Sequence, residues 1–474
     1  MKKYCIVLCM LGGLFGCQIP KSTVVGTNPD LPSNFAGTGV ADTTSSADME
    51  RRAMFSSPRL SALIDTVIRN NYDLLMAAQR IRSAQAMVIQ TSGLLRPMVN
   101  LGAVPSIRKF GLYTMDGAGN ASTDIKPGQV VPEHLPDFFF GAQASWEVDL
   151  WGKLKNRKKA AAARFFSSME GQHLIVSNLV SETSAAYYEL VAADHELRVL
   201  DQTIQLQEQA IELVKVQKQA AVVNELAVQQ FEAQLLNMRS MRSLIQQAVV
   251  RIENRINLLA GRFYQPIQRD TTFFSDAALP RFKEGLPSAL LRNRPDIRMS
   301  EWDLQAAKAD LTAARAMFYP ALNIGASLGT QGYNPSILFR FPESLAYTLV
   351  AGLTAPVINR SMIKGEFQRA DANQVEALYN YQKVVTRGFN EVYEELSNIR
   401  NLQDVYHYKR KENSTLSGSI QVASELFRTG RADYLEVLLT SQNALRTNIE
   451  LIETRKNQYL AAIGLYKALG GGWK

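Results

Sequence analysis

The side chains that could carry covalent or metal chemistry are few in this sequence and poorly placed for catalysis. All 3 cysteines lie within its first seventeen positions. No glycine-rich loop opens a helix as a phosphate-binding site would, and the 14 scattered methionines favour packing over soft-metal transport. The histidines are far apart and lack ligand spacing: His134, His173, His195 and His407. We therefore expect no catalytic residue and no metal site.

Cys17 is placed for acylation. A positively charged start and a short apolar run precede it, which is the plan of a secretory signal and is too short to span a bilayer. In the segment LFGC, Gly16 precedes the cysteine and Leu14 lies three places before it, which resembles a bacterial lipobox. We predict a signal peptide over residues 1–16 and an N-acyl, S-diacylglycerol lipid on Cys17. The alternative is a plain signal with incidental cysteines.

Composition indicates an exported, folded chain behind a tether. Residues 17–55 are rich in Ser, Thr, Pro, Gly and Asp, without apolar periodicity, and are expected to be extended. After the signal no apolar run is long enough for a transmembrane helix. The net charge is +8, but cations and acids are mixed along helical faces, and an exported chain rarely meets nucleic acid. We expect no nucleic-acid partner.

The elements that would position any site come in two copies. One match has a constant offset of 223 positions, as in Pro97 and Pro320. The other has an offset of 209, as in Asn224 and Asp433. We therefore divide the chain into a first repeat (56–262), a connector (263–288) and a second repeat (289–474).

Each repeat is expected to hold a helix, a strand pair and a long segment without proline. The helices are predicted at about Pro58–Gly93 and Pro295–Phe318. The strand pairs are predicted within 99–150 and 321–357. The long segments are predicted at about Lys153–Arg262 and Ser361–Leu469.

The strands alternate apolar and polar residues, as half-buried or lipid-facing strands do. The apolar positions include Trp146, Leu322, Ile324 and Leu349. Four strands cannot close a useful barrel, and an open edge in lipid is very costly. From the strands alone, a soluble sheet and a barrel pooled from several chains both remain open.

The long segments repeat apolar residues every seven positions, which is typical of coiled coils. One arm shows Leu190, Leu197, Ile204 and Ile211, and its counterpart shows Val385, Val392, Ile399 and Tyr406. The arm 153–219 alone would be roughly 100 Å long at 1.5 Å per residue. We predict two helical hairpins, with turns at Thr429–Asp433 and near Ala220–Asn224. Gly430 suits a helix end and Asp433 a helix cap.

Four motifs resemble lipid-anchored, TolC-type outer-membrane efflux channels, in the expected order. They are the stretches Leu290–Gly329, Ser145–Arg157, Leu426–Asn448 and Leu465–Lys474. The resemblance implies an α+β fold in which a homotrimer builds one β-barrel of four strands per chain, twelve in all, and a periplasmic coiled-coil barrel. It implies a passive outer-membrane conduit for multidrug or metal efflux in a Gram-negative bacterium. Its partners would be a periplasmic adaptor, an inner-membrane transporter and outer-membrane lipid.

The same resemblance implies a gate and docking tips at the hairpin turns. Glu436 matches a gate acid, and Phe427 takes the gate position where relatives carry tyrosine. Leu439 stands where a second acid is expected, and Asp433 lies nearby. The alternative for Glu436 is a solvated position paired with Arg or Lys. The adaptor-contact tips would be Gly430, Arg431, Val223 and Asn224.

Two functional alternatives remain open from the sequence. A channel of the same fold could serve type I protein secretion, although the lipobox and the Arg294-Pro295-Asp296 motif favour drug or metal efflux. A lipid-anchored periplasmic scaffold without a pore is the other.

Loops on the far side of the strands are expected at about 111–136 and 332–342.

Overall fold

The computed structural model describes residues 20–23, 32, 35, 57–270, 285, 287–355 and 360–474. The predicted signal peptide, Cys17 and most of the tether lie outside the described residues. The chain divides into two compact units. The strand unit comprises residues 1–26, 82–165 and 302–378, and the hairpin unit comprises residues 27–81, 166–301 and 379–474.

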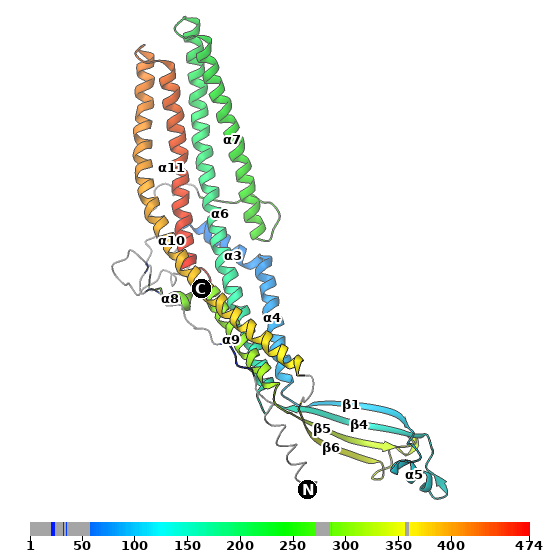
Figure 1. Ribbon diagram of the computed structural model, residues 1–474. Coiled ribbons are helices and arrows are strands. Elements are labelled where there is room, and N and C mark those ends of the chain that lie inside the picture. The colour runs from blue at the N-terminus through cyan, green and yellow to red at the C-terminus, as the bar shows by residue number, and fades with distance from the viewer. Residues whose placement is uncertain are drawn as a thin grey trace. The chain divides into compact units, whose positions relative to one another are not determined.

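The strand unit is built on one antiparallel sheet with the order β1-β4-β5-β6 (Figure 1). Its strands are β1 (Met98–Arg108), β4 (Leu135–Val148), β5 (Ala321–Gly332) and β6 (Leu345–Thr354). The first repeat supplies β1 and β4 and the second supplies β5 and β6, so that the β4–β5 pairing joins the repeats. Among the described residues, β1 and β6 each pair on one side only, which leaves both edges of the sheet open.

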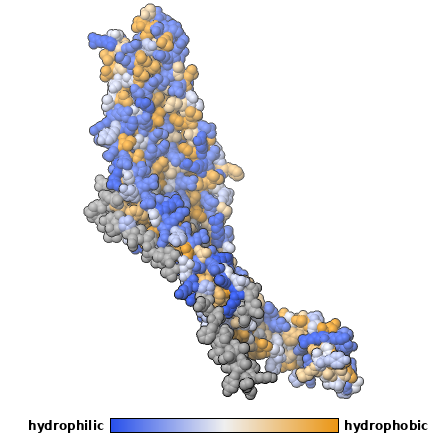
Figure 2. Space-filling model, in the orientation of Figure 1, coloured by the Kyte–Doolittle hydropathy of each residue, from blue (hydrophilic) through white to orange (hydrophobic). Residues whose placement is uncertain are grey.

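The strand register gathers the apolar residues on one face of the sheet. Ala142 of β4 lies opposite Leu101 of β1 and Leu328 of β5, and Leu328 lies opposite Tyr347 of β6. The alternate row sets Gln143 opposite polar residues on both sides: Asn100 and Ser327. Apolar side chains on this sheet are widely exposed, with 76% of Leu101 and 74% of Leu349 accessible. Figure 2 shows orange, hydrophobic surface over the strands. One face is therefore apolar and uncovered within a single chain.

Two facing glycines allow β4 and β5 to approach closely. Gly141 and Gly329 are paired in register. A Cβ on Gly329 would lie 2.3 Å from the Phe140 carbonyl oxygen, and one on Gly141 would lie 2.4 Å from the Leu328 oxygen. Only glycine fits both positions without moving the backbone.

The connection from β1 to β4 is more ordered than the predicted loop at 111–136. It contains helix α5 (Met115–Ser122) and a small hairpin of β2 (Asp124–Lys126) and β3 (Gln129–Val130). Thr114 caps α5 by accepting from the Gly117 N–H at 3.1 Å. Between β5 and β6 lies only the short 3₁₀ turn η3 (Pro335–Ile337).

The two long segments form helical hairpins (Figure 1). The first consists of α6 (Lys153–Gln219) and α7 (Glu225–Leu259), and the second of α10 (Ser361–Arg428) and α11 (Tyr434–Ala468). Shorter helices are α8 (Ala289–Asn293) and α9 (Pro295–Ala316), the latter close to its predicted range. No described helix is apolar and long enough to cross a membrane.

The first predicted helix is wrong in one respect, because Asn71 divides it into α3 (Pro58–Asn70) and α4 (Tyr72–Gly93). The Asn71 backbone is extended. Its Oδ1 accepts from the Leu74 N–H at 3.1 Å, and its Nδ2 donates to the Leu259 carbonyl at 2.9 Å. The buried side chain thus caps the second helix and holds the end of α7.

The buried stripe of α6 also differs from the predicted heptad at one position. Leu190, Ile204 and Ile211 are buried, but Leu197 is only half-buried while Leu200 is fully buried. A straight helix with 3.6 residues per turn drifts away from a strict seven-residue repeat. The face that meets its neighbours therefore moves along this long helix.

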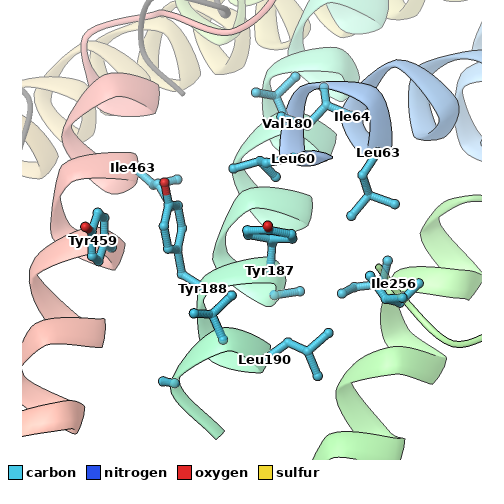
Figure 3. Close-up of a cluster of buried hydrophobic side chains, with 14 of the residues drawn as sticks. Leu60, Leu63, Ile64, Val180, Tyr187, Tyr188, Leu190, Ile256, Tyr459 and Ile463 are labelled. Atoms are coloured by element: carbon cyan, nitrogen blue, oxygen red, sulfur yellow. The ribbon is translucent and has the colours of Figure 1, made fainter. Parts of the chain in front are cut away.

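The main core of the hairpin unit gathers side chains from α3, α6, α7 and α11. Figure 3 shows Tyr187 and Tyr188 on α6 projecting from the same stretch of helix toward different neighbours. Tyr188 stacks on Tyr459 with ring centroids 4.3 Å apart, and burial raises the pKa of Tyr188 above its usual range. Tyr187 is fully buried, and its hydroxyl accepts from the Asp270 N–H at 3.1 Å. This core fixes the hairpins where both meet α3.

Candidate functional site

The turn of the second hairpin is closed by glycine. Gly430 has φ +70°, in the left-handed region. The Arg431 N–H donates to the Leu426 carbonyl at 2.8 Å, and the Gly430 N–H donates to the Phe427 carbonyl at 3.1 Å. This pair of bonds is the Schellman motif that ends many helices. The turn lies in the predicted stretch.

The first hairpin ends in the same motif without glycine. The Val222 N–H donates to the Gln217 carbonyl at 2.9 Å, and the Ala221 N–H to the Lys218 carbonyl at 3.0 Å. Ala221 has φ +55° and is the one described non-glycine residue with a left-handed backbone. A Cβ in this region costs about 1–2 kcal/mol. The repeat offset locates this turn, whereas nothing in the local sequence indicates the strain.

The two turns differ in how they start the next helix. Asn224 accepts the Ala227 N–H on its Oδ1 at 3.2 Å and caps α7. Asp433 is the N-cap residue of α11, as predicted, but its side chain makes no capping bond. Its backbone carbonyl accepts the Glu436 N–H at 3.1 Å instead. The carboxylate of Asp433 is exposed at the turn.

Glu436 lies in the first turn of α11 and is exposed. Within the described part of the chain, no lysine, arginine or histidine nitrogen lies within 4.0 Å of its carboxylate, unlike Glu225 in the first hairpin, which pairs with Lys218. The predicted alternative of a paired position is therefore not realised in a single chain. A carboxylate suits the positive end of a helix. Leu439, one turn further, is also exposed.

Phe427 is half-buried in the wall of a groove between the two hairpins, in the hairpin unit. The groove has a volume of about 440 Å³. Its wall is mainly apolar, with side chains from α6, α7, α10 and α11 that include Leu206, Leu213, Phe231, Val437 and Leu445. Phe427 thus faces the neighbouring hairpin of its own chain.

The hairpins are joined near their turns. Leu438 of α11 packs into a cluster with Ile211, Val228 and Phe231 of the first hairpin, and half-buried Val223 lies against it. Gln442 Nε2 donates to Gln234 Oε1 at 2.9 Å. Asn224, Gly430 and Arg431, by contrast, are exposed. Of the predicted tip residues, three lie at the surface and Val223 belongs to the packing beneath it.

A second joint, which the sequence did not predict, is built around Arg294. Its guanidinium is buried and donates to Asp296 at 2.7 and 3.0 Å, to Glu391 at 2.7 Å and to the Ala468 carbonyl at 2.9 Å. Burial disfavours the charge, but the two carboxylates outweigh it and raise the pKa of Arg294. The sequence feature that could have indicated this joint is the Arg294-Pro295-Asp296 motif, because a buried arginine needs carboxylates nearby.

The residues that follow α11 complete this joint. Gly470 has φ +92°, and a Cβ there would lie 2.6 Å from the backbone of Asn293. Trp473 donates from Nε1 to the Asn293 carbonyl at 3.1 Å and stacks on His173 with centroids 4.5 Å apart. The glycines and tryptophan of the last motif therefore hold α11 against α6 and α8.

The predicted membrane positions lie together in the strand unit. Ile324 is opposite Trp146, and Leu322 is opposite Val148. Leu349 is 74% exposed. Trp146 is half-buried, and its indole N–H donates to the Leu95 carbonyl at 3.2 Å. Trp146 therefore also anchors the connection between α4 and β1.

Metal ligation finds no support in the part of the chain that the structure describes, where no group of three or more His, Cys, Asp or Glu side chains could hold an ion.

Comparison with known proteins gives consistent matches over nearly the whole chain. The model of the family described as "Outer membrane efflux protein" matches residues 63–262 and 286–471. The pyoverdine export outer membrane protein OpmQ of Pseudomonas putida is 27% identical over 470 residues, covering 98% of this chain and 97% of the relative. The cation efflux system protein CusC of Escherichia coli is 26% identical over 423 residues, covering 89% and 88%.

Solved structures share the fold. A CusC crystal structure superposes with a TM-score of 0.81 at 25% identity, covering 95% of this chain and 99% of that one. The open state of the Neisseria gonorrhoeae MtrE outer membrane channel gives a TM-score of 0.83 at 20% identity, covering 96% and 98%.

Proposed function

The chain belongs to the outer membrane efflux protein family, and from this premise we propose that it is the exit duct of a tripartite efflux pump. It would work with a periplasmic adaptor and an inner-membrane transporter and would conduct substrate passively, without catalysis. The single observation that carries the proposal is the sheet, whose apolar face is uncovered and whose two edges are open. Such a sheet is suited to lipid once its edges are paired.

Closure requires other copies of the chain, and a homotrimer would pool twelve strands. The internal repeat supports a specific register for the seam between copies. Leu101 of β1 pairs with Ala142 of β4. In the second repeat, Leu101 corresponds to Ile324 (offset 223) and Ala142 to Ala351 (offset 209). Ile324 of β5 and Ala351 of β6 pair in the same way. The strand pairing therefore follows the repeat.

The β4–β5 seam within the chain then serves as the template for the β6–β1 seam between chains. Phe140 of β4 pairs with Thr330 of β5. Phe140 corresponds to Leu349 of β6 at the offset of 209, and Thr330 corresponds to Ile107 of β1 at the offset of 223. We therefore expect Leu349 to pair with Ile107 of the neighbouring copy. Both side chains are on the apolar face, and they are 74% and 73% exposed in the single chain.

Cysteine cross-linking tests this register. The double variant Leu349→Cys with Ile107→Cys should give disulfide-linked trimers on mild oxidation, because paired strands bring Cα atoms to about 5 Å. The control, Leu349→Cys with Ala103→Cys, separates the pair by four residues, or roughly 13 Å. Equal cross-linking of both pairs, or of neither, would reject the register.

Glu436 is the proposed gate residue. Three copies would bring three exposed carboxylates toward the axis at the hairpin turns, where a ring of like charge attracts cations. Asp433 would line the same constriction, with Phe427 behind it in the wall of the groove between the hairpins. Glu436→Ala should lower the cation preference or ease opening in single-channel recordings. Glu376→Ala, which removes an exposed carboxylate elsewhere on α10, is the control. Unchanged selectivity and opening in Glu436→Ala would remove it from the gate.

The exposed turns are the proposed adaptor contacts, through Gly430, Arg431 and Asn224, with Val223 supporting the turn from beneath. We also propose that Cys17 carries the lipid anchor. Cys17→Ala should abolish incorporation of labelled fatty acid, and continued incorporation would show that the lipid is attached elsewhere.

Conduction and substrate need separate experiments. Purified protein should give conductance steps in a planar bilayer, and a complete absence of steps under every gate-opening condition would reject the channel. Relatives are named for pyoverdine export and for cation efflux, which supports small molecules or metal ions as substrates here. Sensitivity of a deletion strain to drugs, dyes and metals would identify them.

A further inference from the structure

The start of α6 carries an unusual concentration of cations. Lys155, Arg157, Lys158 and Lys159 are all exposed within the first two turns. The first turn holds no acidic residue. Asp149, just before the helix, accepts the N–H groups of Leu154 and Lys155 at 2.9 and 2.8 Å and so satisfies the helix end from within the chain.

This placement disfavours the isolated helix in two ways. Cations at a helix N-terminus oppose the helix dipole. Lys155 lies three and four residues before Lys158 and Lys159, a spacing that sets like charges beside each other on one face. Throughout the described residues, no carboxylate lies within 4.0 Å of these four cations, whereas the neighbouring Lys153 pairs with Glu147. An anion from outside the chain would relieve both effects.

The second repeat shows that the fold does not need these charges. At the offset of 209, the four cations correspond to Lys364, Glu366, Phe367 and Gln368 of α10. The four positions carry a net charge of +4 in α6 and zero in α10, yet the helices begin within one residue of the same repeat position, at Lys153 and Ser361. The charges of α6 therefore serve something other than the helix itself.

Two partly exposed aromatic side chains lie close to the cluster in sequence. Trp151 stacks on Tyr319 with centroids 4.8 Å apart and donates from Nε1 to the Pro320 carbonyl at 2.7 Å. Trp151 is 50% exposed and Tyr319 is 38% exposed. Both lie where strands give way to helices, and amphipathic rings are enriched at that level at membrane–water interfaces. Lys155 follows Trp151 by four residues, in the first turn of α6.

The tether supplies an independent limit on distance. Thr23 donates from its backbone N–H and its hydroxyl to the Asp371 carboxylate, at 3.0 and 2.6 Å. Thr23 follows the proposed acylated Cys17 by six positions, a length of chain that spans at most about 20 Å. Asp371 is ten residues, or about 15 Å, along α10 from Ser361. The first turns of the strand unit's helices are therefore within reach of the leaflet that holds the anchor.

We propose that Lys155, Lys158 and Lys159, with Arg157 beside them, bind the phosphate groups of anionic phospholipids in the inner leaflet of the outer membrane. The inference rests on the proposed membrane-spanning barrel, which places the strand ends at that leaflet. Juxtamembrane cations gain enough from an anionic surface that each is expected to change affinity about fivefold. Three cations together should change it on the order of 100-fold.

Native mass spectrometry of the full-length protein in detergent tests the site. The protein is mixed with equal amounts of phosphatidylglycerol and phosphatidylcholine, and retained lipids are counted. The parent should retain phosphatidylglycerol preferentially, and the triple variant Lys155→Gln, Lys158→Gln, Lys159→Gln should lose the preference. The control Lys383→Gln, Arg410→Gln, Lys411→Gln removes three exposed cations further along α10 and should keep it.

Other outcomes assign the cations elsewhere and overturn the proposal. A triple variant that retains the preference excludes these residues from lipid binding. A triple variant that dissociates into monomers assigns them to carboxylates of a neighbouring copy. Equal displacement by inorganic phosphate at matched ionic strength assigns them to a soluble anion. Conductance of the parent protein keeps the two proposals separate: a conducting parent without lipid preference rejects only the lipid site, and a parent that never conducts rejects the channel.

Discussion

Exchanging the residues at the two hairpin turns should change their local stability in opposite directions. Ala221 and Gly430 hold the same position in two copies of one motif, at φ +55° and +70°. Ala221→Gly removes a strain of about 1–2 kcal/mol but adds about 0.5–1 kcal/mol of backbone entropy to the opened state. The turn should gain about 0.5–1 kcal/mol. Gly430→Ala should lose a similar amount, since nothing lies within 4 Å of its added Cβ and only the backbone conformation matters.

Hydrogen exchange measured by mass spectrometry is the suitable assay, because it reports local opening without unfolding the assembly. The reporting amides are those of Val222 and Arg431, which close the two turns at 2.9 and 2.8 Å. Exchange near Val222 should slow by about two- to fivefold in Ala221→Gly, and exchange near Arg431 should quicken by a similar factor in Gly430→Ala.

Each variant serves as the other's control, because the turn that is not altered should exchange at the parent rate. Faster exchange at Val222 in Ala221→Gly would show that the left-handed alanine is not strained, and the reasoning from backbone geometry would be refuted. The same recordings bear on function, since these turns are the proposed adaptor contacts.

Three further predictions concern the sheet, the Arg294 joint and the half-buried acid Glu196. Gly329→Ala should lower the yield of folded protein in the outer membrane, because the clash of the added Cβ with β4 costs about 1–3 kcal/mol. The control Gly325→Ala, whose Cβ meets nothing within 4 Å, should keep the parent yield, and equal yields of the two variants would contradict the close approach. Arg294→Met should lower the free energy of unfolding by about 3 kcal/mol in denaturant titration, because it leaves the carboxylates of the joint unpaired. Substitution of the exposed neighbour, Arg292→Met, should lower it far less, and similar losses would mean that the contacts of Arg294 do not stabilise the fold. Burial raises the pKa of Glu196 in the folded state, so the contribution of this group to the free energy of unfolding is greatest below the unfolded pKa of 4.5 and falls as the pH rises through the folded pKa. Glu196→Gln should remove this fall, giving a higher melting temperature than the parent at neutral pH but not at pH 4; a pH-independent difference would argue against desolvation.

The internal repeat made the hairpin turns and strand pairs predictable. A turn or strand that is clear in the sequence of one copy gives, through the constant offset, the position of its counterpart in the other copy. Gly430 located the turn at Ala221 in this way, and the alternation around Ile324 anticipated the apolar face. In these segments the local sequence pattern and the structure agree. The family resemblance likewise agrees with the matches to known outer membrane channels.

The features that escaped prediction depend on contacts between distant residues. Asn71 ends a helix because its side chain reaches the carbonyl of Leu259, 188 positions away. Leu200 rather than Leu197 is fully buried because a neighbouring helix decides which face is covered. Arg294 needs partners from three separate parts of the chain. No local periodicity contains this information, since it arises only when the helices pack.

The seam between β4 and β5 has a consequence for the order of folding. Ala142 and Leu328 pair across it although roughly 190 residues of chain separate them. Pairing of such distant segments is slow, because a long loop must close before any contact forms. The hairpin of β1 and β4 is synthesised and exported well before β5, and it carries exposed apolar residues and an open edge. Open edges of this kind favour aggregation. We therefore expect the first strand pair to be most prone to aggregation in the interval before the second pair arrives.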